Sequence, residues 1–210
     1  MIQGGLFDEP SSLAPSPEED LQRYKTLSEL YEATKNCKKC RLGETRKNYV
    51  FGEGNEKAKL VLVGEAPGAE EDEQGLPFVG RSGQLLNNIL AAVKFQRSEV
   101  YICNVIKSRP PNNRNPEPDE IAACAPYLYR QLEIIRPKVI LALGRVAANA
   151  LLNNNQSMQA MRGKPHKWRN IDVIVTYHPA ALLRNPNWKR LCWEDVQLMR
   201  RIYDEKCAND

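Results

Sequence analysis

Short, purely apolar runs recur along the chain and alternate with stretches in which apolar residues return every three or four positions. The runs are rich in β-branched residues, which is typical of strands buried on both faces of a sheet. They predict strands over residues 59–63, 100–106, 139–143 and 173–177. The intervening periodicity predicts helices over residues 19–34, 82–93, 119–135, 145–152 and 188–203.

This alternation of strand and helix predicts a parallel sheet with right-handed crossovers. We therefore expect an α/β fold with three layers, α/β/α, around a central four-stranded parallel sheet. Residues 1–18 are rich in Ser and Pro and contain few large apolar residues. Such a segment cannot bury enough surface to offset its ordering entropy. We expect a flexible tail over residues 1–18 and a single folded domain over residues 19–210.

Composition narrows the class of protein. The chain has 210 residues, of which 42% are hydrophobic and 27% charged, and no apolar run approaches membrane-spanning length. The N-terminus has no basic region followed by an apolar stretch, so we expect a cytoplasmic protein without a membrane partner. We also expect this protein to be a monomer. Its six cysteines are then not expected to form disulfides. Lys and Arg exceed Asp and Glu by 30 − 26 = 4, which permits nucleic-acid binding without arguing for it.

Residues 64–86 are the most informative stretch. Gly-Glu-Ala-Pro-Gly follows the first strand, and an acidic run leads to Gly-Leu-Pro-Phe-Val-Gly-Arg-Ser-Gly before a helix. Asn104 and His178 lie at the ends of two other predicted strands, and Arg109 follows closely after Asn104. The carboxyl ends of parallel strands share one edge, where open α/β sheets bind their ligands. These segments can therefore form one site.

The loop before the second helix carries an aromatic ring and a helix start. Phe78 stands between Pro77 and Gly80, where its ring can stack on a flat ligand such as a nucleobase. An ordinary core phenylalanine is the alternative. Ser82 is suited to cap the following helix, and Arg81 beside it would favour an anion at the helix start. A plain capped helix fits these two residues equally well.

Asn104, His178 and two carboxylates are candidates for base recognition and chemistry. The amide of Asn104 pairs a donor with an acceptor and matches the polar edge of uracil. The imidazole of His178 can stabilise negative charge on a leaving group. Both side chains can instead satisfy local backbone groups. Glu65, or Glu71 in the acidic run, can orient a water or a cationic intermediate, although a solvated face is the simplest interpretation of that run.

The segment after His178 contains Leu182, Leu183 and Arg184. Two leucines followed by an arginine can form an apolar wedge with a phosphate contact. Proteins that extrude a base from DNA insert such wedges into the gap. The alternative is a pair of leucines packed in the core at the start of a helix.

Cys37 and Cys40 have the Cys-x-x-Cys spacing of metal and cluster sites, and Cys124 on a predicted helix is a candidate third thiolate.

Together these motifs resemble the family 4 uracil-DNA glycosylases, the iron–sulfur branch of that superfamily. The resemblance covers about residues 30–203. It is carried by Gly-Glu-Ala-Pro-Gly at 64–68, Gly-x-Pro-Phe-Val-Gly-Arg-Ser-Gly at 75–83, Lys-x-Arg-Pro-Pro at 107–111, Asn-Arg-x-Pro at 113–116 and His-Pro at 178–179.

The resemblance implies a role for each of the candidate residues. Glu65, Ala66 and Pro67 would line a uracil pocket, Phe78 would stack on the base, Asn104 would read its polar edge, and His178 would support the uracil anion. Glu65 or Glu71 would position water, and the sequence does not decide between them. The reaction would be hydrolysis of the N-glycosidic bond, which releases uracil and leaves an abasic site. DNA contacts are expected from Arg81, Ser82, Arg109, Leu182 and Arg184.

The family binds a [4Fe–4S] cluster through four cysteines, and this chain departs from that pattern. Cys37, Cys40 and Cys124 match three of the ligands, but Ser108 stands at the position of the fourth. Serine is a poor ligand because its alkoxide is far harder to form than a thiolate. The alternatives are a three-cysteine cluster with an oxygen or solvent ligand, a degraded [3Fe–4S] site, or no cluster. Our hypothesis is a bound but labile cluster.

Residues Gln3 to Phe7 read Gln-Gly-Gly-Leu-Phe, which resembles the pentapeptide that binds bacterial sliding clamps. A chance match is the alternative, because short motifs arise easily.

Two other functions compete with a uracil-DNA glycosylase. One is a non-catalytic nucleic-acid-binding or redox-sensing module on the same fold. The other is a glycosylase with an altered base preference, such as hypoxanthine.

Overall fold

The computed structural model describes residues 21–208, which form a six-stranded sheet in the order β1-β3-β2-β4-β6-β5. The four inner strands are parallel to one another, and the two edge strands are antiparallel to their neighbours. The predicted four-stranded parallel sheet is therefore confirmed as the centre of a wider, mixed sheet. The strands are β1 (Glu53–Gly54), β2 (Leu60–Gly64), β3 (Tyr101–Asn104), β4 (Val139–Leu143), β5 (Pro165–Trp168) and β6 (Ile171–Thr176).

The two edge strands carry no apolar run that would reveal them in the sequence. β1 has two residues, and glycines with positive φ angles, Gly52 and Gly54, lie in and beside it. β5 begins with Pro165 and continues with His166 and Lys167 before its one buried residue, Trp168. Proline and charged residues are tolerated on a sheet edge, where one side of the strand needs no backbone partner.

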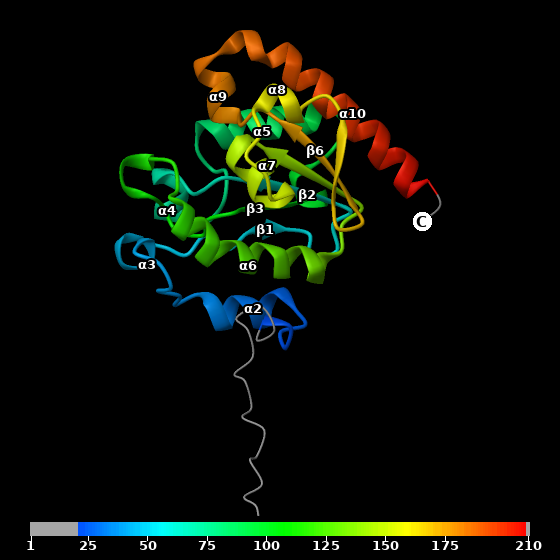
Figure 1. Cartoon of the computed structure of the whole chain (residues 1–210). Helices are drawn as coiled ribbons and strands as arrows, with labels where there is room; N and C mark the ends of the chain where they lie inside the picture. Colours follow the sequence, from blue (N-terminus) through cyan, green and yellow to red (C-terminus); the bar gives the residue numbers. More distant parts are fainter. Residues whose placement is uncertain (1–20, 209–210) are drawn as a thin grey trace, which may run out of the picture.

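Helices cover both faces of the sheet, giving the predicted three layers. Val61 and Val63 of β2 face a core formed with α2, α6 and α7, whereas Leu60 and Leu62 face a second core formed with α5, α9 and α10. Figure 1 shows α2 and α6 below the sheet and α5 and α10 above it. The helices are α2 (Leu27–Thr34), α3 (Leu42–Thr45), α4 (Ala69–Gln74), α5 (Arg81–Ala92), α6 (Pro118–Ile135), α7 (Arg145–Leu152), α8 (Met158–Met161), α9 (Pro179–Arg184) and α10 (Lys189–Cys207).

The predicted helix over residues 19–34 is interrupted, because residues 22–26 are not helical. Helix α2 begins only at Leu27, because Thr26 and Glu29 form a reciprocal capping box that starts a helix there. The Glu29 backbone N–H donates to Thr26 Oγ1 at 3.1 Å, and the Thr26 N–H donates to the Glu29 carboxylate at 3.1 Å. Residues 1–20, including the predicted tail, and residues 209–210 lie outside the described residues.

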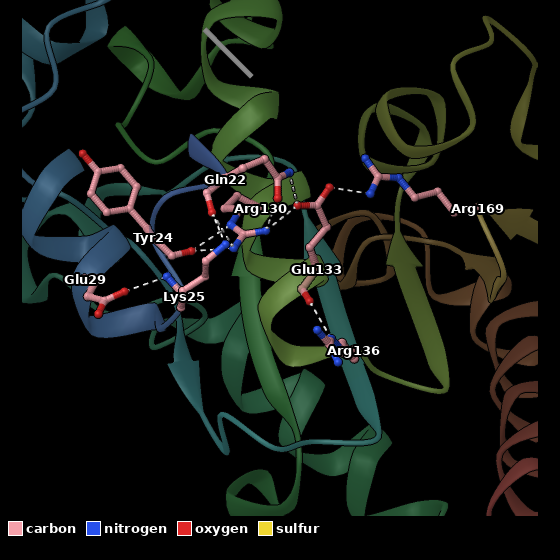
Figure 2. Close-up of polar contacts among 8 residues, drawn as sticks. All are labelled: Gln22, Tyr24, Lys25, Glu29, Arg130, Glu133, Arg136 and Arg169. Carbon is pink, nitrogen blue, oxygen red and sulfur yellow. Dashed lines mark hydrogen bonds and ion pairs between the residues drawn. The ribbon is translucent and has the colours of Figure 1, made fainter. Parts of the chain in front are cut away.

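The non-helical segment before α2 is fastened to α6 by Arg130. Its guanidinium donates to the Tyr24 carbonyl, at 3.0 Å from Nε, and to Gln22 Oε1 at 2.7 Å. Glu133 pairs with Arg130 at 2.8 Å and also with Arg169 of the β5–β6 connection (Figure 2). Carbonyl groups that a helix would have satisfied internally are thus satisfied by a side chain from the neighbouring helix.

Strand order places the candidate residues on one edge. The chain runs from β2 to β3 on one side of β2 and then crosses to β4 on its other side. Such a reversal opens a crevice beyond the carboxyl ends of the strands. Within residues 21–208, no helix is long and apolar enough to cross a bilayer.

Candidate active site

A cavity of about 320 Å³ opens at the carboxyl edge of the sheet. The segments after β2, β3 and β6 and the first turn of α5 form its wall. The structure therefore brings together all the side chains that the sequence proposes for base binding. The lining residues are Glu65, Ala66, Pro67, Gly68, Glu71, Phe78, Ser82, Asn104, Pro110, Asn113, Arg114, Asn115, His178, Ala180 and Arg184.

Phe78 is held in an unusual backbone conformation between two close-packed glycines. Its φ is 52°, and its ring is 5% exposed. A Cβ on Gly83 would lie 1.8 Å from the Phe78 carbonyl oxygen, and a Cβ on Gly64 would lie 2.6 Å from Phe78 Cζ. Both glycines are needed because only a residue without a side chain lets the backbone approach so closely. The glycines of the motif thus set the position of the ring.

Asn104 ends strand β3 beside Gly64 and is 1% exposed. Its Oδ1 is buried without a hydrogen-bond partner among the described residues. A Cβ on Gly64 would lie 2.3 Å from this oxygen, so the glycine also makes room for the amide. A buried polar atom without a partner is costly, and in a cavity wall it indicates that a ligand is its partner.

His178 caps helix α9, and this bond fixes how its ring is protonated. Its Nδ1 accepts a hydrogen bond from the Ala180 N–H at 3.1 Å, so in the neutral ring the proton is assigned to Nε2. Burial, assisted by the positive charge of Arg184 and opposed by Glu71, lowers the pKa of His178 to about 4. At neutral pH the ring is therefore an uncharged donor of one N–H to the cavity.

The two candidate carboxylates differ in their surroundings. Glu71 accepts backbone hydrogen bonds from Gly68 at 3.1 Å, Val79 at 3.0 Å and Gly80 at 3.1 Å, which closes the loop around Phe78. Glu65 follows β2 directly and lines the cavity, and burial raises its pKa despite the nearby charges of Arg145 and Arg184. The Glu71 carboxylate holds the backbone, whereas the Glu65 carboxylate faces the cavity.

An ion-pair cluster supports the loop of residues 110–115. The Asn-Arg-x-Pro motif at 113–116 overlaps this loop, and the sequence predicts no role for it. Arg114 lines the cavity and binds the Glu120 carboxylate at 2.6 and 2.8 Å. Arg41 adds a contact at 3.0 Å, and the Glu120 side chain is fully buried. These contacts, with Arg114 the strongest, lower the pKa of Glu120 to about 2. In the sequence, only the Asn-Arg-x-Pro motif indicated that Arg114 is part of the site.

Two expectations for the DNA-binding residues are corrected. Leu182 is 1% exposed and packs in the core with α5 and α10, so it cannot act as a wedge, whereas Leu183 is 38% exposed. Ser82 does not cap α5: the cap is Gly80, and the helix has already begun at Arg81. Ser82 nevertheless lines the cavity.

The three arginines expected at DNA all lie near this edge. Arg184 is exposed and lines the cavity, and Arg81 is exposed at the start of α5. Arg109 lies outside the cavity wall, and its Nε donates to the side chain of Asn113 at 2.8 Å.

The three cysteines of the predicted cluster lie near one another beside α6. Cys37 Sγ is 3.3 Å from the Tyr127 hydroxyl, and Cys124 Sγ accepts the Lys107 N–H at 3.3 Å. Burial, with smaller effects from Cys37 and Cys40, raises the pKa of Cys124 to about 11. Among residues 21–208, no three His, Cys, Asp or Glu side chains converge on a single metal ion.

Ser108 is engaged by an arginine. The side chain of Ser108 is buried, and its Oγ accepts a hydrogen bond from Arg46 Nη1 at 2.9 Å. The second nitrogen of the same guanidinium donates to the Lys35 carbonyl at 2.8 Å. Of the four positions that the sequence pattern gives to cluster ligands, three hold cysteines and the fourth holds a hydrogen-bonded hydroxyl.

The edge cavity of this α/β sheet brings together an aromatic ring, an amide oxygen without a partner among the described residues and a neutral imidazole, a set of groups suited to a flat polar ring. Comparison with known proteins agrees. The model of the Uracil DNA glycosylase superfamily matches residues 51–197, and the chain belongs to this superfamily.

Curated relatives align with most of the chain. A Type-4 uracil-DNA glycosylase of Archaeoglobus fulgidus is 47% identical, over 87% of this chain and 96% of its own length. Those of Sulfurisphaera tokodaii and Thermotoga maritima are each 45% identical, over 84% and 83% of this chain and 84% and 93% of their own lengths.

Proposed function

We propose that this protein is a uracil-DNA glycosylase, which hydrolyses the bond between uracil and deoxyribose and leaves an abasic site. The observation that carries the proposal is the unpaired Oδ1 of Asn104, buried in the wall of a cavity that also contains Phe78 and His178. The family and its Type-4 members at 43–47% identity support the same activity.

Recognition begins with a base turned out of the DNA stack, because a cavity at a sheet edge cannot reach a base inside a duplex. Phe78 provides a face on which the base stacks. The Asn104 amide presents Oδ1 to the N3–H of uracil and its NH₂ group to O4. Cytosine offers an acceptor at N3 and a donor at N4, so it would oppose both contacts. The orientation of the amide sets the base preference.

Bond cleavage sends the electron pair of the C1′–N1 bond to N1 of uracil. The resulting charge is delocalised on to the carbonyl oxygens, and His178 Nε2–H can donate a hydrogen bond to one of them. Because the pKa of His178 lies near 4, the ring remains a neutral donor and gives up no proton at neutral pH. Water then adds its oxygen to C1′ and gives its proton to the Glu65 carboxylate, from which solvent can carry it to the uracil anion.

We assign the positioning of that water to Glu65 rather than to Glu71. The carboxylate of Glu71 already accepts three backbone hydrogen bonds in the Phe78 loop. Glu65 lines the cavity, and its carboxylate can orient the water and stabilise the positive charge that develops on the sugar.

Oligonucleotides that contain uracil opposite guanine, opposite adenine or in a single strand test the activity. We expect alkali-labile abasic sites with the wild-type chain and a strong loss with Asn104→Ala and His178→Ala. Lys164→Met, at an exposed position away from the cavity, is the matched control. Failure on every substrate would leave a non-catalytic nucleic-acid-binding or redox-sensing module. Faster release of hypoxanthine than of uracil would indicate an altered base preference.

We propose DNA contacts from Arg81, Ser82, Arg109 and Arg184 and assign the wedge to Leu183. These residues lie in or near the cavity, and Leu183 is the exposed member of its pair. Binding through phosphates weakens as salt rises, because bound counterions are released. Substituting Arg184 should therefore reduce the salt dependence of DNA binding.

We infer that Cys37, Cys40 and Cys124 hold a [4Fe–4S] cluster at three of its corners. When bound, such a cluster would cross-link the segment before α3 to helix α6, and it supports the fold because metal binding is coupled to folding. The Arg46 hydrogen bond favours the neutral hydroxyl of Ser108 over an alkoxide ligand. A cluster held by three cysteines, without a fourth thiolate from the protein, would be labile.

Iron and sulfide analysis of anaerobically purified protein tests this assignment. Ser108→Cys should raise the iron retained after exposure to air, whereas Cys103→Ser, a buried thiol outside the ligand set, should leave it unchanged. Iron-free, fully folded wild-type protein would contradict a bound cluster.

The sliding-clamp partner is proposed on sequence alone, since Gln3 to Phe7 lie outside the described residues. A pull-down with the clamp should recover the wild-type chain and lose the Leu6→Ala/Phe7→Ala variant. Equal recovery of both would remove the proposal. We also propose that the protein is associated with the nucleoid, because its proposed substrate is DNA. We propose further that it is a monomer, and light scattering in solution tests this.

A further inference from the structure

Lys107 is a fully buried lysine three residues beyond the end of β3. It does not line the cavity. Its Nζ donates to the backbone carbonyl of Asn104 at 2.8 Å and to the side-chain oxygen of Gln131. The Phe51 ring lies on another side, with its centroid 5.8 Å from Nζ. The amino group is thus enclosed by two neutral oxygens and an aromatic face.

Burial lowers the pKa of Lys107, because no carboxylate among the described residues lies beside its amino group to offset the cost of a buried charge. Across residues 21–208, no carboxylate forms an ion pair with Lys107, and the groups within reach are the thiols of Cys103 and Cys124. A buried ammonium without a counter-charge is costly, and a neutral side chain of similar volume would usually fit a core at lower cost. What this side chain gains at the site is its pair of hydrogen bonds, to the Asn104 carbonyl and to Gln131, which the amino group can donate in either protonation state.

The contact with Asn104 gives the lysine a place in the site. Val105 N–H donates to the Gly64 carbonyl at 3.0 Å, and Ile106 N–H donates to the Glu65 carbonyl at 2.9 Å. These bonds fix the segment that follows Asn104, and the Lys107 amino group fixes the Asn104 carbonyl itself. The Asn104 Oδ1 has no hydrogen bond of its own, so backbone placement and packing determine where the amide points.

Gln131 secures the other side of the amino group. Its Nε2 donates to the Phe51 carbonyl at 3.0 Å, and the residue is fully buried on α6. The lysine therefore braces the end of β3 against the longest helix that packs on that face of the sheet. An amino group that donates to two fixed oxygens is held in place more firmly than one with a single partner.

We propose that Lys107 is a positioning residue for base recognition: its buried amino group donates to the Asn104 carbonyl and so sets the direction of the Asn104 amide in the cavity. The inference rests on the proposed function of Asn104. It predicts that the effect of Lys107 on catalysis passes through Asn104 and disappears when the amide is removed.

A double-mutant cycle on a uracil oligonucleotide tests this prediction. Lys107→Met, which keeps the volume but loses the donor, should lower kcat by about 10- to 100-fold, as expected when the Asn104 carbonyl loses this buried hydrogen bond. KM should stay within about threefold, because the DNA contacts lie elsewhere. In the Asn104→Ala background the same change should lower kcat by less than about threefold, since coupled residues are not additive. Lys164→Met should have no effect in either background.

Thermal melting checks that each variant is folded at the assay temperature. If the methionine variant does not fold, Lys107→Leu repeats the cycle with another side chain that has no donor. A kcat loss of equal size in both backgrounds, or none in the wild-type background, overturns the inference. A wild-type chain that is inactive on uracil DNA overturns the proposed function instead, so the two failures are distinguishable.

Discussion

The rings of Phe78 and His178 lie 5.4 Å apart between centroids, with their planes inclined by 31°. One ring comes from the segment between β2 and α5 and the other from the turn between β6 and α9. The stacking surface and the hydrogen-bond donor of the proposed active site are therefore in mutual contact. A change that moves either ring displaces the other.

Gly64→Ala tests how closely the cavity wall is packed. The new Cβ would lie 2.3 Å from Asn104 Oδ1 and 2.6 Å from Phe78 Cζ, so both groups would have to move. We expect a stability loss of about 1–3 kcal/mol from overpacking and a larger proportional loss of activity. Urea denaturation and uracil release, measured on the same preparation, check this. Full activity in a folded variant would contradict the assigned geometry.

Glu65→Gln and Glu71→Gln should have opposite consequences. Glu71→Gln weakens three backbone contacts, so it should lower the free energy of unfolding by about 1–3 kcal/mol. Glu65→Gln should leave stability nearly unchanged and lower kcat by about 100-fold or more, as for loss of a general base. Denaturant titration and single-turnover kinetics separate the two. A low kcat for Glu71→Gln at unchanged stability would reverse the assignment of the carboxylates.

The imidazole of His178 predicts a pH dependence of stability. Its pKa is lowered to about 4 in the folded chain from an ordinary value of 6.5, so between these values the unfolded chain binds more protons. The free energy of unfolding should be highest above pH 6.5 and fall by up to about 3 kcal/mol as the pH approaches 4. His178→Asn keeps a capping acceptor and should flatten this part of the profile. The free energy of unfolding of both proteins is obtained from urea titrations at each pH. If it falls equally with pH in the two proteins, the ring is not buried as described.

The ion pairs of Glu120 should produce a second fall in the free energy of unfolding, at a more acidic pH than that of His178. Its pKa is lowered to about 2 from 4.5, so its ion pairs stabilise the fold above pH 4.5 and are lost as the pH falls toward 2. Glu120→Gln should be less stable than the wild type at pH 7, and the difference should shrink by pH 3. Denaturation at the two pH values provides the measurement. A constant difference would mean that the pairing with Arg114 and Arg41 contributes nothing.

Leu182→Ala and Leu183→Ala form a matched pair. Truncating buried Leu182 should cost about 2–5 kcal/mol of stability. Truncating exposed Leu183 should change stability by less than about 0.5 kcal/mol. If Leu183 is the wedge, its loss should lower activity on double-stranded uracil DNA more than on single strands. Equal losses on both substrates would remove the wedge assignment.

The inner strands and the long helices could be predicted because their signals are local. Apolar runs marked β2, β3, β4 and β6, and periodicity marked the long helices such as α6. The edge strands were missed because a two-residue strand beside Gly52 and a strand that begins with Pro165 have no pattern of their own. Their pairing is decided by neighbours distant in the sequence.

The cavity residues were found because each follows a strand end, a position that can be read without coordinates. The direction of a side chain could not be read in the same way. Leu182 and Leu183 are chemically identical, and only the packing of α9 against α5 buries one of them. Likewise, the acidic run showed carboxylates but not that Glu71 turns inward to the backbone of Val79 and Gly80.

The cavity draws its wall from the first and the last of the parallel strands, β2 and β6. A partly folded chain that has assembled β2 and β3 would possess Phe78 and Asn104 yet no imidazole. Recovery of base release during refolding should therefore lag behind the formation of that first strand pair and coincide with the docking of β6. The protein becomes capable of acting on DNA only when its sheet is finished, which makes catalysis a readout of completed folding.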